Sequence, residues 1–296
     1  NLVNYVIISQ IVISSFTSII FYKMIKHFFS QKIAISGAIV FCLFPLIVYS
    51  ASQISSATIY LFLLLTFILL ILDLVNSNPK YSYKSLILIG IVAGILILTR
   101  RDFLLIFLFT LFYFFIFFKL NIKKIIFIFF VTAITISPYL VRNYIAFDKI
   151  IVHSGFGYNL WKAYNINANV EGFYIESTSL KSKIEKVKKD TYYRINEDKL
   201  YLESAKEFIL ENPGKSLKLF IKRFFSFFFI DLNSSQENYY NVFHILPNLM
   251  ISFLSIFGLI FCDKKKPKYN YLILIMTVML LVYSVFALLP RYKLYI

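Results

Sequence analysis

Residues 55–75 read SSATIYLFLLLTFILLILDLV, and Asp73 is the one charged side chain among them. An apolar run of this length can cross a membrane as a helix, which takes about 20 residues. Comparable runs recur along the chain, at residues 1–22, 33–49, 55–75, 85–98, 103–118, 125–141, 244–261 and 271–288. We therefore expect an all-α membrane protein, folded as a polytopic helix bundle with about eight spans.

The composition excludes an ordinary water-soluble domain. Of the 296 residues, 59% are hydrophobic and 16% are charged, whereas soluble domains average about 45–50% and about 25%. The two cysteines, Cys42 and Cys262, are too few and too distant for a disulfide framework or a thiolate metal site. Glycine is scarce, and neither GxGxxG nor GxxxxGK[ST] occurs, so nucleotide-binding classes built on glycine-rich loops are excluded as well.

The positive charges predict how the chain is oriented in the membrane. If the spans alternate in direction, one set of short loops holds twelve lysines and the other set holds four cations. The lysines are Lys23, Lys26, Lys32, Lys80, Lys84, Lys119, Lys123, Lys124, Lys264, Lys265, Lys266 and Lys268, and the four cations are Arg100, Arg101, Arg291 and Lys293. Cytoplasmic loops attract Lys and Arg, so we expect the lysine-rich set inside and the long stretch 143–243 outside. The net charge of +16 then belongs mainly to topology, and we expect no nucleic-acid partner.

This pattern divides the chain into three parts. We expect a membrane domain with about six spans over residues 1–142 and an extracytoplasmic loop domain of mixed structure over residues 143–243. Two further spans, ending in an Arg-Tyr motif, are expected over residues 244–296. The chain begins without Met and stops directly after a charged cluster, so we expect a fragment of a longer protein, a multi-pass protein of a bacterial inner or plasma membrane.

Two helices are predicted inside the long loop. Residues 196–211 place apolar side chains on one face, and Asn212-Pro213-Gly214 ends that helix. Residues 215–229 carry lysines on one stripe and Leu or Phe on another, which is typical of a helix lying in the membrane interface. The alternative is that 215–229 crosses the membrane, which would put the lysines of 264–268 outside, against the charge bias.

Polar groups on the expected outer side are the candidate site. The runs 85–98 and 103–118 are short for full spans, and we expect partial spans that meet at a polar tip. Guanidinium groups at headgroup depth can bind phosphate through paired hydrogen bonds, and aromatic rings beside amides suit a sugar pocket. The candidates are Arg100, Arg101 and Asp102 at the tip, Arg142 and Asn143 after the sixth run, Tyr158, Asn159 and Trp161 in the loop, and Arg291 and Tyr292 after the eighth run.

Structural explanations of the same residues stand beside these. An arginine at the end of a span is commonly an anchor that extends to the interface, and Arg101 beside Asp102 can be a simple ion pair. Gly90 and Gly94 form a GxxxG pattern, which indicates close helix packing rather than chemistry. Trp161 can equally be a core or interface anchor.

Several motifs together resemble a known family. Leu98-Thr99-Arg100, the passage SPYLVRNY at residues 137–144, GYNLW at 157–161, AKEFILENP at 205–213 and LPRY at 289–292 occur in that order. They are similar to motifs of integral-membrane glycosyltransferases of the C superfamily. The resemblance is strongest to the branch of dolichyl-phosphate-mannose protein mannosyltransferases and bacterial lipid A aminoarabinose transferases.

The resemblance implies a donor, an acceptor and a mechanism. It implies transfer of a sugar from a polyprenyl-phosphate-sugar to a lipid, glycan or protein acceptor on the extracytoplasmic face, among membrane lipids. It names no cofactor with certainty, and a divalent cation stays open. The family's catalytic Asp would lie upstream of Asn1, so no catalytic base is assigned and the fragment is expected to be nearly inert. Lys162 and Ala163 depart from the family's usual Gly-Asn after the tryptophan.

Two other functions are kept open. A lipid or glycan transporter would place charges mid-span at broken helices, whereas the spans here are largely free of charge. An outer-face polysaccharide ligase or polymerase would use the same lipid-phosphate chemistry, and composition does not separate it from a transferase.

Overall fold

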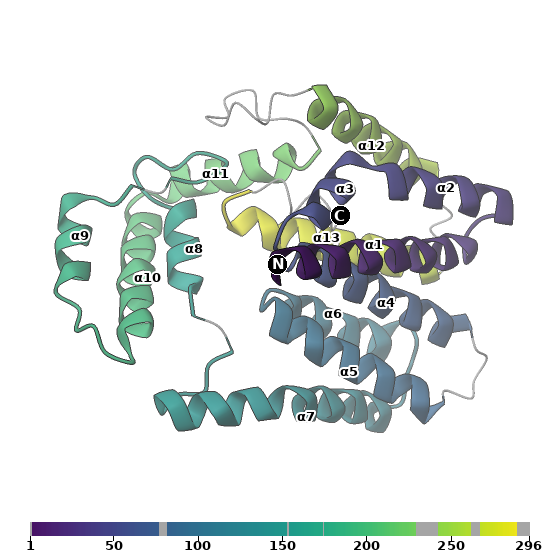
Figure 1. Cartoon of the computed structure of the whole chain (residues 1–296), viewed down its shortest axis with the longest axis horizontal. Helices are drawn as coiled ribbons and strands as arrows, with labels where there is room; N and C mark the ends of the chain where they lie inside the picture. Colours follow the sequence, from purple (N-terminus) through teal and green to yellow (C-terminus); the bar gives the residue numbers. More distant parts are fainter. Residues whose placement is uncertain are drawn as a thin grey trace. The chain divides into compact units, whose positions relative to one another are not determined.

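The structure is a computed structural model that describes residues 2–76, 82–152, 154–173, 175–228, 242–261 and 267–288. Every regular element in these ranges is a helix, so the all-α expectation is confirmed there (Figure 1). The helices are α1 (Leu2–Lys26), α2 (Gln31–Leu43), α3 (Pro45–Ser52), α4 (Ala57–Asn76), α5 (Tyr83–Thr99), α6 (Phe103–Ile116), α7 (Ile122–Phe147), α8 (Phe156–Ala163), α9 (Thr178–Glu185), α10 (Tyr193–Glu211), α11 (Pro213–Ser226), α12 (Val242–Phe261) and α13 (Pro267–Val285).

All eight predicted apolar runs fall on helices, and some of these helices are long enough to span a membrane. By length and composition, four described helical stretches qualify, namely Val3–Lys26, Ala57–Val75, Ile122–Phe147 and Lys268–Val285. The pair α2 and α3, bent by 50°, would make a fifth span. Helices α5 and α6 are apolar but shorter, as is the stretch Ile245–Gly258 of α12. Four to five candidate spans therefore support a membrane protein, and the number of about eight stays a prediction.

The bend between α2 and α3 has a local cause. Phe44 has extended backbone angles (φ −65°, ψ 122°), and Pro45 begins α3 as its first residue. Proline lacks the N–H that would continue the hydrogen bonds of α2, so the helix ends and a new one starts. The sequence analysis treated residues 33–49 as one apolar run, although this run contains Pro45.

The chain divides into two compact units. The first contains Asn1–Pro138 and Gly258–Val278, and the second contains Tyr139–Phe257 and the stretch that begins at Met279. The break at Pro138 lies near the predicted boundary after residue 142. Residues of the predicted third part, 244–296, occur in both units, and the division into three parts stays a prediction.

In the first unit α4 is the central helix. It packs against α1 and α5, and the side chains of Tyr60, Phe67 and Ile71 are fully buried. Phe103, which begins α6, packs edge-on against Phe67 with ring centroids 5.1 Å apart. The aromatic and aliphatic side chains of the apolar run 55–75 therefore contribute to the interior of this unit.

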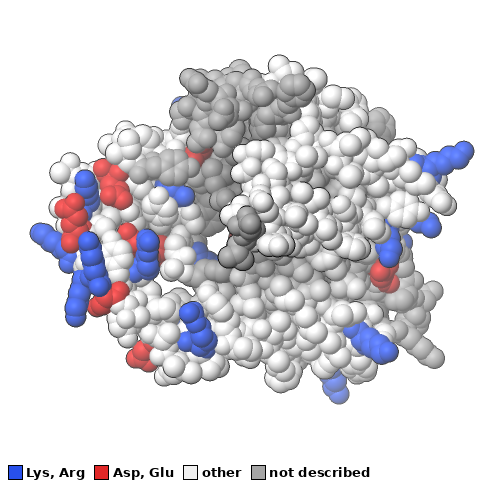
Figure 2. All heavy atoms as spheres, viewed as in Figure 1, with Lys and Arg blue, Asp and Glu red and all other residues white. Residues whose placement is uncertain are grey.

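The outer surface of the first unit is apolar. On α1, the side chains of Val12, Phe16 and Ile19 are each about half exposed or more. Figure 2 shows few charged side chains over α1 and α2 except near their ends, whereas charges of both signs gather over α9 and α10. Exposed apolar side chains with few charges between them are expected where lipid covers the surface.

The second unit is built around α10. Helix α8 packs along α10, and α9 and α11 also contact α10. The core contains Leu160 and Trp161 of α8 and Tyr201 and Ala205 of α10. A Cβ on Gly157 would lie 1.9 Å from the Asp198 carbonyl oxygen, so only glycine allows α8 and α10 to approach this closely.

The helices predicted within the loop are present. The predicted helix 196–211 is the larger part of α10, which ends at Glu211, and Pro213 begins α11. The predicted amphipathic helix 215–229 corresponds to α11 up to Ser226, and residues 229–241 lie outside the described part of the chain. Whether these helices form an extracytoplasmic domain stays a prediction.

Candidate functional site

The predicted polar tip lies between α5 and α6. Arg100 caps the end of α5, where its backbone N–H donates to the Leu96 carbonyl oxygen at 2.8 Å. Its guanidinium makes two contacts with the Asp102 carboxylate, Nε to Oδ1 and Nη2 to Oδ2, both at 3.2 Å. The side chains of Arg100 and Asp102 are 15% and 17% exposed. Only the contact from Nε to Oδ1 is a hydrogen bond, and the contact from Nη2 to Oδ2 is an ion pair. Together they restrict the orientation of the guanidinium.

The Tyr60 ring makes a cation–π contact with the same guanidinium. The Arg100 Cζ atom lies 5.0 Å from the ring centroid of Tyr60, which is fully buried in α4. Cation–π attraction adds to the ion pair with Asp102 in fixing the position of the arginine. The sequence analysis considered an ion pair between Arg101 and Asp102, and the structure shows that Arg100 pairs with this carboxylate.

This pairing changes the electrostatics of the tip. Because Asp102 balances the charge of Arg100, the net positive charge of the three residues equals that of Arg101, which is partly exposed. A phosphate at the tip would therefore meet one oriented guanidinium and one further cation. Both arginines are candidates for such an anion.

Arg142 and Asn143 lie near the end of α7 and have different environments. Asn143 is 3% exposed, and its Nδ2 donates to the Ile151 carbonyl oxygen at 2.6 Å. Its Oδ1 accepts from Arg142 Nη1 at 2.8 Å, while the Arg142 residue itself is exposed. Asn143 thus links α7 to the chain that follows it. This structural role differs from the binding role that the sequence analysis considered.

Convergence of the arginines on one phosphate stays a prediction. Arg100 belongs to the first unit and Arg142 to the second. Arg291 and Tyr292 lie outside the described residues.

The three predicted pocket residues on α8 differ in exposure. Trp161 is 3% exposed, and its ring lies 5.1 Å from that of Tyr201 and 6.1 Å from that of Tyr158. Tyr158 is half-buried, with Lys162 Nζ 4.6 Å from its ring centroid. Asn159 is exposed. The structure therefore places Trp161 in the core of the second unit, and Tyr158 and Asn159 are the members of this group that reach its surface.

A carboxylate network next to these rings was missed by sequence reasoning. The Tyr201 hydroxyl donates to Glu176 Oε1 in a short hydrogen bond, and the Tyr158 backbone N–H donates to Asp198 Oδ1 at 2.9 Å. Burial raises the pKa of Tyr201, and its hydrogen bond to the carboxylate of Glu176 raises the pKa further. Glu176 and Tyr201 are distant in sequence and match no spacing rule, so no sequence signal could have paired them.

Arg223 is a second functional candidate that the sequence concealed. It is fully buried, and its Nη2 donates to the Ala163 carbonyl oxygen and, at 3.1 Å, to that of Asn169. Its Nε donates to the Val170 carbonyl oxygen at 3.3 Å. Burial lowers the pKa of Arg223 to about 10, and the nearby Tyr164 opposes that shift. Arg223 thereby holds residues 163–170, the segment that directly follows the GYNLW motif.

Neither a metal nor a relative identifies the site. Among the residues that the structure describes, no three His, Cys, Asp or Glu side chains lie close enough to hold a metal ion. The chain matches no protein-family model, no curated protein and no solved structure. Its function must therefore be argued from the residues and geometry given above.

Proposed function

We propose that this chain is the membrane-embedded part of a glycosyltransferase that uses a polyprenyl-phosphate-linked sugar on the extracytoplasmic face. The proposal includes the finer topology, with about eight spans and residues 143–243 outside. The observation that carries it is the tip at residues 100–102, where Asp102 and Tyr60 orient the Arg100 guanidinium between two apolar helices. The order of motifs from Leu98 to residue 292 supports the same reading.

The tip suits the leaving group of such a reaction. An acceptor hydroxyl or amine attacks the anomeric carbon, the bond from that carbon to the phosphate oxygen breaks, and the electron pair stays on the phosphate. Negative charge therefore grows on the phosphate as the reaction proceeds. Cations that are already oriented stabilise that charge without further reorganisation. Arg100 and Arg101 would perform this task, and the general base is not among the residues assigned here.

The donor's lipid tail agrees with the surroundings of the tip. Helix α6 exposes Leu104, Leu105 and Leu108 directly after Asp102. A polyprenyl chain would lie against such a surface while its phosphate stays at the polar turn. Phosphate and apolar chain are then recognised by adjacent parts of one helix.

Substitution of the tip arginines tests the proposal in the complete protein. Arg100→Lys should weaken binding of a polyprenyl-phosphate-sugar about 10- to 150-fold, because an ammonium cannot reproduce the planar two-bond fork. Arg101→Gln should also weaken binding, because it removes the net positive charge of the tip. Arg194→Lys is the matched control, because Arg194 is exposed and pairs with Glu197 in the second unit.

Binding is measured with purified protein and a labelled donor, together with the melting temperature of each variant. If both tip variants melt normally and bind the donor as tightly as the Arg194→Lys control, the arginines are interface anchors and the proposal fails.

A lipid or glycan transporter is the second candidate, and one feature of the first unit favours it. The span pair α2 and α3 is bent by 50°, and the buried Gln10 donates from Nε2 to the Ser55 carbonyl oxygen at 3.0 Å. Broken helices with polar groups at membrane depth are typical of transport sites. Protein reconstituted in vesicles separates the two functions, because a transporter moves the lipid-linked sugar across the bilayer without an acceptor, whereas a transferase consumes it only when an acceptor is present.

A further inference from the structure

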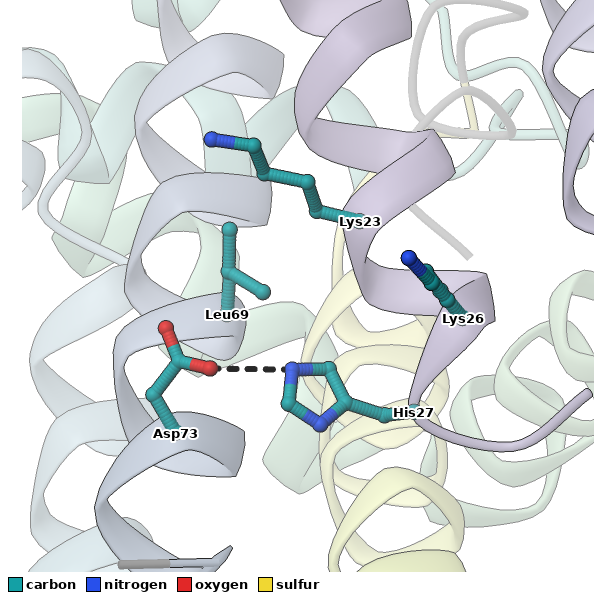
Figure 3. Close-up of a pocket in the computed structure, with 5 residues that line it drawn as sticks. All are labelled: Lys23, Lys26, His27, Leu69 and Asp73. Carbon is teal, nitrogen blue, oxygen red and sulfur yellow. Dashed lines mark ion pairs between the residues drawn. The ribbon is translucent and has the colours of Figure 1, made fainter. Parts of the chain in front are cut away.

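A basic pocket lies between the last turns of α1 and α4, in the first unit. Its volume is about 250 Å³, and it is lined by Lys23, Lys26, His27, Leu69 and Asp73 (Figure 3). These residues belong to the lysine-rich side of the chain, opposite in the predicted topology to the tip at residues 100–102. The proposed sugar transfer uses none of them.

The pocket has one carboxylate, and that carboxylate has a partner. His27 Nε2 lies 3.0 Å from Asp73 Oδ1, and Figure 3 shows the imidazole pointing at the carboxylate across the gap between the two helices. The His27 side chain is 16% exposed, and that of Asp73 is 59% exposed. With Asp73 engaged by His27, the ammonium groups of Lys23 and Lys26 give the pocket an excess of positive charge, so an anion suits it better than a cation.

An apolar strip on α1 leads to this pocket. Phe16 and Ile19 precede Lys23 by two turns and one turn of the helix and share its face. They are 56% and 51% exposed. In the pocket itself, Leu69 of α4 supplies an apolar wall. A ligand that fits has a phosphate at the lysines and a hydrocarbon chain that runs back along α1.

We propose that this pocket binds the phosphodiester headgroup of an anionic phospholipid in the cytoplasmic leaflet. Lys23 and Lys26 would donate charge-assisted hydrogen bonds to the phosphate oxygens. Phe16 and Ile19 would contact the acyl chain. The inference needs α1 and α4 to cross the membrane with their lysine-rich ends in the cytoplasm, and it does not depend on the catalytic proposal.

The experiment compares two double variants of the full chain in detergent. Lys23→Gln with Lys26→Gln removes two charges from the pocket, and Lys84→Gln with Lys123→Gln removes two exposed charges from the same predicted side, outside the pocket. Each lysine near an anionic headgroup contributes about fivefold in affinity, so the pocket variant should bind phosphatidylglycerol about 25-fold more weakly. The control variant should bind it almost as well as the unaltered protein. Retention of lipid in native mass spectrometry measures both, and melting temperatures verify that both variants fold.

A third variant and two further ligands test the chemistry. Asp73→Asn removes the negative charge of the pocket and should strengthen binding of phosphatidylglycerol, whereas weaker binding would contradict an anion site. Phosphatidylcholine, which has no net charge, should bind less tightly than phosphatidylglycerol. Inorganic phosphate at millimolar concentration should not displace the lipid, and displacement would identify a site for free phosphate. Equal losses in the two double variants would mean unspecific attraction and would also overturn the proposal.

Discussion

Trp161 shows how the environment of one side chain decides its task. It is the single tryptophan of the chain and lies within a GYNLW motif, where an aromatic ring beside amides suggested a sugar pocket. In the structure it is 3% exposed and packs between Tyr158 and Tyr201. A buried ring of this size stabilises the unit mainly through the apolar surface that it removes from water.

Trp161→Ala should therefore destabilise the second unit. A cavity left by a buried tryptophan costs about 3–5 kcal/mol. The intrinsic fluorescence of the unaltered protein should be blue-shifted and should not respond to a lipid-linked sugar. Denaturant unfolding measures the free energy, with Asn159→Ala, at an exposed position of the same helix, as the control. If Trp161→Ala leaves the stability unchanged, or if the emission of Trp161 shifts with ligand, Trp161 belongs to a binding surface and not to the core.

The hydroxyl of Tyr201 gives the second unit a dependence on alkaline pH. Tyrosine in an unfolded chain has a pKa of about 10, and burial and the Glu176 carboxylate raise the pKa of Tyr201 in the folded state. The folded state then holds the proton more tightly than the unfolded state. The stability contributed by Tyr201 is fully present below about pH 10 and is lost as the pH rises above that value.

Tyr201→Phe should reduce this loss. Thermal unfolding followed by circular dichroism between pH 8 and 11 should show a steeper alkaline decline for the unaltered protein than for the variant. Arg223 has the opposite effect on the pH dependence of stability. Its pKa is lowered to about 10 in the folded state, so the folded protein releases this proton at a lower pH than the unfolded chain does. Since Arg223 is present in both proteins, the difference between the two curves isolates Tyr201. Parallel curves would show that the hydroxyl does not titrate differently on folding.

At the scale of elements, two glycines of α5 allow this helix to pack closely against α7. A Cβ on Gly90 would lie 2.7 Å from Val131 Cγ1, and a Cβ on Gly94 would lie 2.6 Å from Thr135 Cβ. Thr132 Oγ1 also donates to the Gly90 carbonyl oxygen at 3.1 Å. The packing interpretation of the GxxxG pattern is confirmed, because small residues let the two backbones approach.

Gly90→Ala and Gly94→Ala should each destabilise the first unit. An added methyl group in a filled interface costs about 1–3 kcal/mol, since Val131 or Thr135 must move. Gly258→Ala in α12 is the control, because outside the neighbouring backbone of its own helix no atom of the described residues lies within 4 Å of the Cβ position. Melting temperatures in detergent compare the three. Equal melting temperatures for all three variants would show that the helices do not depend on this contact.

Helix α11 has three faces with different environments. Sequence periodicity identified its lysine stripe and its apolar stripe, and Leu217 and Ile221 of the apolar stripe are indeed 60% and 44% exposed. The face that packs on the second unit is a third one, with Ser216, Leu219 and Arg223. A buried arginine among phenylalanines was not predictable, because only the carbonyl groups of residues 163–170 make its burial favourable.

At the scale of the whole molecule, the distribution of lysines predicts a sidedness that can be measured. A reporter fused after Trp161 should score as extracytoplasmic, and a reporter fused after Lys266 should score as cytoplasmic. The reason is the excess of twelve cations over four in the two sets of short loops. A fusion after Lys123 provides a second cytoplasmic control.

Two results would contradict this orientation. If the fusions after Trp161 and Lys266 report the same side, the segment around α11 crosses the membrane rather than lying in its interface. If all three fusions report the reverse of the expected sides, the charge bias does not set the topology.

The helical and membrane character of the chain follows from its sequence because both depend on local quantities. Runs such as 55–75 are long and apolar, and a chain in lipid must satisfy its backbone hydrogen bonds within each segment. Local signals also located the end of α10 at Glu211 and the turn between α5 and α6. Asn212-Pro213-Gly214 and the charged residues 100–102 interrupt the pattern at these two places, so these boundaries need no knowledge of distant residues.

The tasks of individual polar residues were decided by tertiary contacts. The sequence could not tell that Asp102 pairs with Arg100, or that the Tyr60 ring of another helix packs against the same guanidinium. The sequence also could not predict that Trp161 and Arg223 are buried, because their partners on α10 and in residues 163–170 are distant along the chain. Periodicity states which face of a helix is apolar, but the energy of a buried charge or ring depends on the atoms that surround it, and only folding brings those atoms together.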